Sequence, residues 1–216
     1  LLVWGEHGFA ELTGIVTLED FVEFTKWTRK EHDMRGYEPE DLVGKGGITH
    51  GDVAPYVYPS DEDIARCDIR GIYMSNFFFW DAKTQGEQMI AEWDFAPVTY
   101  ERERTFNLYA KIEDHANDVH DYLKYLKFGY GRATDDASME IRHGRMTREE
   151  GIDMVRRYDA NEPTTLDGYC EFLGISKQRF YDLVEPMRDP QIWQKKNGAW
   201  TATDSVTKQS IGAREE

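Results

Sequence analysis

The order of apolar and polar positions divides the chain into a first part with strand-like runs and a second part with helix-like stripes. The sequence opens with the apolar run LLVW, which breaks at Gly5. A short apolar run that ends at a polar loop is typical of a buried parallel strand. A second such run, RGIYMSNFFFWD at 70–81, is rich in β-branched and aromatic residues. We therefore predict parallel strands of one sheet over residues 1–5 and about 70–76.

Three threonines, each followed three residues later by an acidic residue, mark helix starts. The pairs are Thr17 with Asp20, Thr84 with Glu87, and Thr147 with Glu150. The first two predict helices over about 18–30 and 84–93, and we expect both to pack on the sheet because parallel strands need cover. The third predicts a helix that begins after Thr147. Residues 36–62 are rich in glycine and proline and predict a long irregular connection.

The second part of the chain is helical in pattern from about Ile112. Apolar positions recur at helical spacing through Val119 and Leu126 until Gly129 supplies a C-terminal stop. The segment TLDGYCEFLGISKQRFYDLVEPM at 165–187 predicts two short helices around a turn and resembles a DNA-binding helix-turn-helix. We interpret it as a structural pair, because the second helix offers only the run KQR before acidic residues follow. The whole pattern predicts an α/β fold, with a sheet domain over 1–110 and a mainly α-helical region over 111–216.

Composition limits the partners that this chain can have. Its 216 residues carry a formal net charge of -15, which argues against binding the phosphate backbone of nucleic acids. No run approaches the roughly 18 apolar residues of a membrane span, and no signal-peptide pattern opens the chain. Cys67 and Cys170 lie far apart and predict two buried thiols in a reducing compartment. We expect a cytoplasmic protein that binds neither nucleic acid nor membrane.

Residues 127–150, KFGYGRATDDASMEIRHGRMTREE, nevertheless gather basic side chains around a glycine-rich bend. Gly129 and Gly131 let the backbone turn sharply and approach a ligand closely. Arginines at positions 142, 145 and 148 are three apart and share a face in a helix or turn. Guanidinium groups beside a helix N-terminus suit a phosphate or carboxylate ligand. This segment is therefore a candidate anion site.

The anion-site hypothesis makes a geometric prediction. Arg132, Arg142 and Arg148 should converge on one cleft near the carboxyl end of the 1–5 strand, where α/β proteins bind ligands. Arg145 should instead point to solvent. In the alternative interpretation, the arginines form a structural ion-pair network with their acidic neighbours. Asp135 and Asp136 can orient the arginines, hold Mg²⁺ or bind sugar hydroxyls.

Histidines give weaker signals. His115 and His120 are five residues apart, a poor spacing for one helical face, so we do not predict a metal site there. His7 directly follows the first predicted strand and is a better candidate for a ligand-facing residue.

The block HDYLKYLKFGYGRATDDASMEIRHGRMTREEGIDMVRRYD at 120–159 resembles the C-terminal signature of the N-acetyl sugar amidotransferases, which act in bacterial surface polysaccharide and flagellin glycan synthesis. These enzymes belong to the PP-loop ATP pyrophosphatase superfamily. The resemblance extends to LLVWGEH at 1–7, PYVYPSDEDI at 55–64, RGIYMSNFFFWD at 70–81 and GISKQRF at 174–180.

The resemblance implies a partial Rossmann-like parallel sheet of PP-loop (HUP) type over residues 1–110, from a domain that binds ATP and Mg²⁺ through an SGGxDS loop. The implied reaction converts the acetamido group of a nucleotide-activated N-acetyl sugar to an acetamidino group. It cleaves ATP to AMP and pyrophosphate, and a glutamine amidotransferase partner supplies the ammonia. Adenylating the amide oxygen creates a leaving group that ammonia can displace. The resemblance leaves open whether the protein forms a homo-oligomer.

The chain departs from the family pattern in two respects. It contains no SGGxDS sequence, and the cysteine cluster of the family's N-terminal region is also absent. We therefore expect the C-terminal part of such an enzyme, inactive alone. The resemblance places substrate or nucleotide binding on the following residues: Gly5, Glu6, His7, Lys127, Gly129, Arg132, Asp135, Asp136, Arg142 and Arg148.

Two alternatives to the enzyme remain. A non-catalytic domain that binds a nucleotide-sugar, or serves as a scaffold, would use the same arginines without the SGGxDS loop. A tRNA-modifying PP-loop relative would need a basic surface, which the net charge disfavours.

Overall fold

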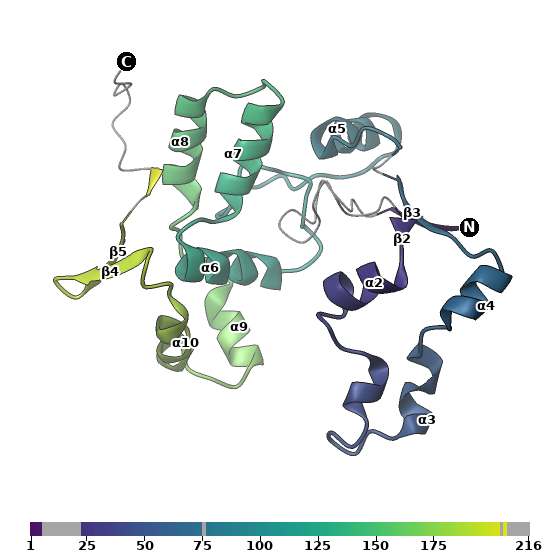
Figure 1. The fold of residues 1–216 in the computed structure, drawn as a ribbon. Helices are drawn as coiled ribbons and strands as arrows, with labels where there is room; N and C mark the ends of the chain where they lie inside the picture. Colours follow the sequence, from purple (N-terminus) through teal and green to yellow (C-terminus); the bar gives the residue numbers. More distant parts are fainter. Residues whose placement is uncertain (6–22, 75–76, 204, 207–216) are drawn as a thin grey trace. The chain divides into compact units, whose positions relative to one another are not determined.

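The computed structural model describes residues 1–5, 23–74, 77–203 and 205–206 (Figure 1). The chain forms two compact units, Leu1–Gln85 and Gly86–Glu216, which we call unit 1 and unit 2. Within the described residues, the secondary structure is mixed α/β, with many short helices and two small sheets. The α/β class predicted from the sequence is confirmed at this level.

Unit 1 contains the predicted pair of parallel strands. Strand β1 (Leu2–Trp4) pairs in parallel with β3 (Gly71–Tyr73), with Leu2 opposite Gly71, and β2 (Glu23–Phe24) adds to the other edge of β3 in the antiparallel direction. The order is β1-β3-β2. Tyr73 is buried, whereas all three side chains of β1 are exposed. The expectation that helices cover this sheet is therefore wrong at β1.

Only the end of the first predicted helix, over about 18–30, falls within the described residues. Thr17 and its cap lie outside the described residues, and Glu23–Phe24 form strand β2. Helix α2 (Lys26–Thr28) starts after Thr25, whose hydroxyl accepts a hydrogen bond from the Thr28 amide, and it continues as a π-helix, η1 (Arg29–Asp33). Thr25 supplies the side-chain acceptor that the first turn of a helix needs, and it does so eight positions beyond the predicted cap.

The glycine-rich stretch at 36–62 is only partly irregular. It holds the 3-10 helices η2 (Pro39–Leu42) and η3 (Ala54–Tyr56), helix α3 (His50–Val53) and the start of α4 (Asp61–Arg66). Thr49 and Asp52 form a capping box on α3, and Ser60 caps α4. These caps were overlooked because the surrounding glycines and prolines dominated the prediction. Cys67 ends α4 and is exposed, contrary to expectation, whereas Cys170 is buried as predicted.

Helix α5 (Ala82–Glu92) confirms the second predicted helix but not its cap. Thr84 lies inside the helix, and its hydroxyl donates to the Asp81 carboxylate at 2.6 Å. The same carboxylate accepts from the Lys83 amide at 3.3 Å, so Asp81 occupies the capping position.

Unit 2 consists mainly of helices that surround one apolar core. Its helices are α6 (Ala116–Phe128), α7 (Arg132–Arg142), α8 (Arg148–Tyr158), α9 (Leu166–Phe172) and α10 (Lys177–Val184), followed by the 3-10 helix η5 (Glu185–Met187). The predicted stripe of α6 packs against α9 and α10, with Val119, Leu126 and Phe180 buried among them. Helix α6 ends at Gly129 with φ 77°, and Thr147 and Glu150 form the predicted capping box of α8.

Helix α7 was not predicted. Gly131 is its N-cap, so the glycine-rich bend is a short connection between two helices. Ala133 and Ala137 are buried on α7, and α8 approaches it closely at Gly151. A Cβ atom at Gly151 would lie 2.8 Å from the Ile141 Cδ1 atom, so glycine permits the contact between these two helices.

A β-hairpin near the end of the described residues was also missed. Strands β4 (Trp193–Lys196) and β5 (Ala199–Ala202) pair around Asn197 and Gly198, which have φ angles of 51° and 82°. Two central residues with positive φ define the tight hairpin turn that Asn-Gly favours. The Trp193 ring meets the Tyr125 ring edge-on at 5.4 Å, and this contact fixes the hairpin to α6.

Candidate functional site

A buried polar network joins α6, α7 and the end of α8 in unit 2. Its centre comes from an irregular segment that precedes α6, where the sequence ERERT at 101–105 alternates in burial. Arg102, Arg104 and Thr105 are buried, whereas Glu101 is exposed. Arginine is almost never fully buried without partners, so these side chains need internal acceptors.

Arg104 obtains its acceptors from backbone carbonyl groups. It is 0% exposed, and its guanidinium donates to the carbonyl oxygens of Tyr158 at 3.2 Å, Asp121 at 3.3 Å and Asn161. The guanidinium also lies over the Tyr122 ring at 5.2 Å. Burial lowers the pKa of Arg104, against the opposing pull of the nearby Asp159 and Asp121 carboxylates. Arg104 therefore ties the loop to α6 and α8 at once.

Arg132 and Asp121 form the strongest ion pair of the network. Arg132 Nε and Nη2 donate to the two Asp121 carboxylate oxygens at 3.0 and 2.9 Å, a bidentate arrangement. Burial acts to raise the pKa of Asp121, but the hydrogen bonds and charge of Arg132, joined by His120, outweigh it and hold the pKa below its ordinary value. Both groups are thus charged at neutral pH and neutralise each other.

The N-terminus of α7 is already filled by a carboxylate of the chain itself. Asp159, the C-cap of α8, is buried and accepts from the Gly131 amide at 2.8 Å and from the Thr134 amide and hydroxyl. A Cβ atom at Gly131 would lie 2.8 Å from Asp159 Oδ1 and 3.1 Å from Arg104 Nη2. Gly131 is therefore required for close approach to an internal anion rather than to a ligand.

Asp136 belongs to the same network, but its pKa is shifted in the opposite direction from that of Asp121. It accepts a hydrogen bond from the Thr105 hydroxyl, and burial raises its pKa to about 6 although Thr105 and the Arg132 charge oppose the shift. Its neighbour Asp135 is more exposed and pairs with Lys124. Two adjacent carboxylates thus have different environments, and burial brings the pKa of Asp136 close to neutrality.

The predicted basic residues fall into two groups at opposite ends of α7. Arg132, Asp135 and Asp136 lie in its first turns, next to Gly129, whereas Arg142 is its last residue. Ten residues of helix separate Arg132 from Arg142 by about 15 Å. Arg148 begins α8 after the short turn from α7, so it lies at the same end as Arg142. The predicted convergence of all three arginines is therefore wrong, because α7 separates them.

Lys127 and Arg145 have local partners of their own. Lys127 Nζ lies 5.0 Å from the centre of the Phe128 ring. Arg145 donates through Nε and Nη2 to Glu140 at 2.9 and 2.7 Å, so it is held in a bidentate ion pair instead of pointing freely to solvent.

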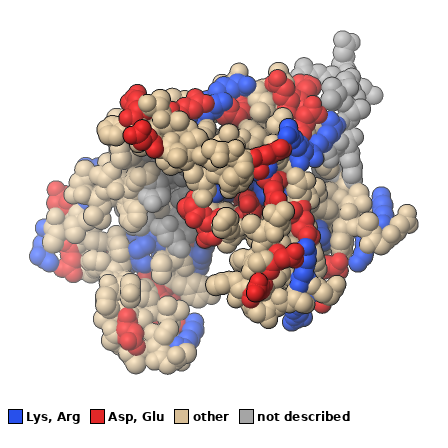
Figure 2. Space-filling view, turned by 180° about the vertical axis from the view of Figure 1, so that it is seen from behind, with Lys and Arg blue, Asp and Glu red and all other residues tan. Residues whose placement is uncertain are grey.

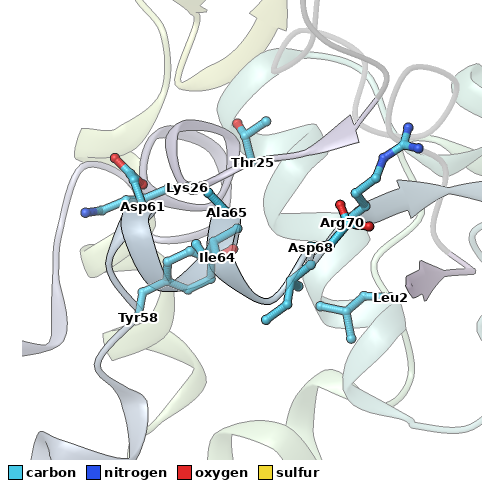
Figure 3. A pocket seen from close by; sticks show the side chains of 11 residues that line it. Leu2, Thr25, Lys26, Tyr58, Asp61, Ile64, Ala65, Asp68 and Arg70 are labelled. Carbon is cyan, nitrogen blue, oxygen red and sulfur yellow. The ribbon is translucent and has the colours of Figure 1, made fainter.

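The strand-end residues are only partly described. Gly5 is exposed and follows β1, whereas Glu6 and His7 lie outside the described residues. A cleft of about 270 Å³ in unit 1 opens at the other, amino ends of the parallel strands, where Leu2, Arg70 and Gly71 line it. Figure 3 shows Tyr58 and Ile64 on one side of this cleft and Leu2 and Asp68 on the other. A role for the carboxyl end of β1 remains a prediction.

Among the described residues, no group of three or more His, Cys, Asp or Glu side chains is placed to hold a metal ion. Arg132, an expected phosphate ligand, is paired with Asp121, and the N-terminus of α7 is occupied by Asp159. On the face drawn in Figure 2, Lys and Arg side chains are scattered among Asp and Glu and form no continuous basic field. None of the described helices has the length and apolar character needed to cross a bilayer.

The core and polar network define unit 2 as a helical domain with a charged interior. Comparison with protein families finds a match over this part of the chain. Residues 102–207 match the family described as "LPS biosynthesis protein WbpG-like, C-terminal domain". The matched segment starts at Arg102 and includes the whole network and the β4–β5 hairpin. The match supports a relationship to WbpG-like proteins and suggests involvement in lipopolysaccharide biosynthesis. No curated protein matches the chain.

The sequence predicted Arg132 and Asp136 as site residues but not the rest of the network. Arg102, Arg104, Thr105, Asp121 and Asp159 were absent from the predicted site, because alternating charges such as ERER usually lie in solvent. The only signal is that the two arginines of this run are spaced by two, which places them on one side of an extended segment.

Proposed function

We propose that this chain is the C-terminal part of an ATP-dependent, AMP-forming amidotransferase of lipopolysaccharide biosynthesis. Its substrate would be a nucleotide-activated N-acetyl sugar, and the acetamido group would become an acetamidino group. The observation that carries the proposal is the match of residues 102–207 to the WbpG-like C-terminal domain, together with the resemblance of the 120–159 block. The parallel β1–β3 pair is consistent with part of a Rossmann-like sheet.

The proposal divides the work between this chain and an SGGxDS-containing segment. ATP and Mg²⁺ would bind to that segment, because the described residues provide neither a metal cluster nor unoccupied phosphate ligands in the network. ATP would supply the leaving group for the amide oxygen, and a glutamine amidotransferase would supply ammonia in the cytoplasm. Unit 2 would hold the sugar nucleotide, with Arg142 and Arg148 as exposed candidates for its phosphates.

The test compares this chain alone with a complete enzyme in which it is joined to an SGGxDS-containing segment. Each is supplied with ATP, Mg²⁺, ammonium and a nucleotide-activated N-acetyl sugar, and the formation of AMP and of the amidine sugar is measured. We expect no AMP from the chain alone and both products from the complete enzyme. The matched control is the same sugar nucleotide with a free amino group in place of the acetamido group, which should yield no amidine.

Two outcomes would contradict the proposal in different ways. Robust AMP formation by the 216-residue chain would overturn the division of work. A complete enzyme that binds the sugar nucleotide but forms neither product would favour the non-catalytic binding domain. The neutralised network of unit 2 gives that second function some support, because a scaffold needs no reactive group.

A further inference from the structure

A groove of about 530 Å³ lies within unit 2, between the start of α6 and one face of α9. Four residues of this face recur at helical spacing and line the groove: Thr165, Gly168, Tyr169 and Phe172. The other face of α9 enters the core through Leu166 and Cys170. Figure 1 shows α9 next to α6. Helix α9 therefore has one closed face and one open face.

The open face has features that a merely solvated helix surface does not need. The Phe172 ring is 84% exposed, although phenylalanine is among the most often buried residues. Gly168 has no atom within 4 Å of the place where a Cβ would stand, so the middle of the groove is empty. The Thr165 hydroxyl is buried and has no hydrogen-bond partner. A buried hydroxyl without a partner is costly, and a bound molecule can supply the missing partner only if the Thr165 side chain rotates toward the groove.

The size of the groove indicates that it binds a small molecule rather than a protein. Seven residues line the groove, whereas a stable protein interface uses roughly 20 to 30 residues on each side. The volume falls in the range of small-molecule sites, which is about 300 to 1,000 Å³.

The charge and shape of the groove lining further restrict the class of ligand that it can bind. The lining contains no lysine or arginine, and it includes the Asp114 carboxylate, so a phosphate group would be repelled. Tyr169 and Phe172 offer two aromatic side chains on one helical face, which suits stacking of a flat, neutral ring. His115 also lines the groove and provides a polar group for the edge of such a ring. A nucleobase combines a neutral flat face with a polar edge.

We propose that the groove between α6 and α9 binds the nucleobase of a nucleotide-activated sugar, stacked on Phe172 and Tyr169, with the phosphates outside the groove. The identity of the ligand rests on the proposed function, whereas the aromatic groove itself does not. A neutral sugar ring also stacks on aromatic side chains and is the competing occupant, which the experiment distinguishes.

The experiment titrates the 216-residue chain with uridine, thymidine, cytidine and guanosine, which carry no phosphate, and with N-acetylglucosamine. Binding is followed by NMR line shapes of the ligand and by shifts in the protein spectrum. At least one nucleoside should bind, and N-acetylglucosamine alone should not. Phe172→Ala should weaken that binding by roughly 5- to 150-fold, the worth of stacking on one aromatic ring.

A second variant tests the groove without removing a contact. Gly168→Met should fill the empty middle of the groove and abolish binding, and it should not unfold α9 because nothing lies near the new side chain and glycine is a poor helix former. Leu183→Ala, at a half-exposed position on α10, is the matched control and should leave affinity unchanged.

Three results would overturn the assignment. These are binding of no nucleoside, binding that survives Gly168→Met, and binding of N-acetylglucosamine that Gly168→Met blocks. The titration needs neither ATP nor ammonia, so its failure is distinguishable from failure of the amidotransferase reaction. If the complete enzyme forms no amidine but Gly168→Met still blocks nucleoside binding, the nucleobase site is supported and the amidotransferase reaction is rejected. If the Gly168→Met enzyme forms amidine with an unchanged KM for the sugar nucleotide, the nucleobase site is rejected and the amidotransferase reaction is supported.

Discussion

The two units use apolar residues in opposite ways. Unit 2 buries its helical stripes around Val119, Leu166 and Phe180, and these side chains are at most 4% exposed. Unit 1 exposes its apolar strand β1, where Leu2, Val3 and Trp4 are between 37% and 53% exposed. Within the part of unit 1 that the structure describes, the buried hydrophobic side chains are Val53 and Tyr73. A parallel strand normally has both faces covered. In unit 1, β1 is regularly hydrogen-bonded to β3, but its side chains are not packed into a hydrophobic core.

The units also differ in what their charged groups do. In unit 2, buried carboxylates and arginines connect the helices to one another. In unit 1, hydrogen bonds at the surface, chiefly from Thr49 and Arg66 respectively, lower the pKa values of Asp52 and Asp63. We infer that substitutions of the buried charged residues should change the stability of unit 2, whereas substitutions of the surface carboxylates should barely affect unit 1. Three measurements, ordered by expected effect, can break or sharpen this contrast.

The largest effect is expected from Arg132→Ala. It leaves the Asp121 carboxylate buried without its bidentate partner. Breaking a buried pair in this way costs about 3 kcal/mol or more of the free energy of unfolding. Hydrogen exchange of individual peptides should show lost protection throughout α6 and α7, and unchanged exchange in unit 1. Arg142→Ala, on the same helix but exposed, is the control and should cost less than about 0.5 kcal/mol. Equal losses for both variants would contradict a structural role for Arg132.

An intermediate and pH-dependent effect is expected from Asp136→Asn. The folded-state pKa of Asp136 is about 6, above the ordinary value of 3.8, so the folded state binds this proton more tightly than the unfolded chain does. Stability therefore falls as the pH rises from about 4 to 6, and above that range the native state holds a poorly solvated charge. Asparagine removes the charge and should stabilise unit 2 by about 1 to 3 kcal/mol at pH 7.5.

The gain from Asp136→Asn should vanish below about pH 3, where the carboxyl group is largely protonated in both the folded and the unfolded wild-type protein. Urea unfolding at the two pH values provides the check. Asp135→Asn, one residue earlier, removes the partner of Lys124 and should give no gain at either pH. A gain of the same size at pH 3 and pH 7.5 would show that packing rather than charge is responsible.

The smallest effect compares one motif in two settings. Thr147 caps α8 and Thr49 caps α3, and each forms a capping box with an acidic residue three positions later. Thr147→Ala should cost unit 2 about 1 kcal/mol, because α8 is part of the core. Thr49→Ala should only increase local exchange in the four residues of α3. If Thr49→Ala lowers the melting temperature as much as Thr147→Ala, the two units are more alike in stability than their burial suggests.

The sequence predicted those elements that rest on large apolar side chains or on caps. The stripe of Val119 and Leu126 predicted α6, and the Thr147 capping box predicted α8. Helix α7 escaped because its buried stripe consists of Ala133 and Ala137, whose small side chains give a weak periodic signal between two glycines. The hairpin was missed although Asn197 and Gly198 carry a strong turn signal.

The candidate site was harder to predict because its partners lie far apart in sequence. Asp121 is 11 residues from Arg132, and Asp159 is 28 residues from Gly131. Spacing within one segment, which suggested a common face for the arginines, cannot show that one end of α7 meets α6 while the other end does not. Tertiary contacts decide which arginines are structural.

The bond from Gly131 to Asp159 has a consequence for how unit 2 opens. It ties together the two ends of the segment 131–159, which contains α7 and α8, without a covalent link. Loss of this bond frees the N-terminus of α7 and the C-terminus of α8 at the same time, so the two helices should open together as one cooperative segment. Amide hydrogens along both helices are then expected to share one opening free energy, instead of fraying independently from four helix ends. A single carboxylate thus makes two helices into one unit of motion.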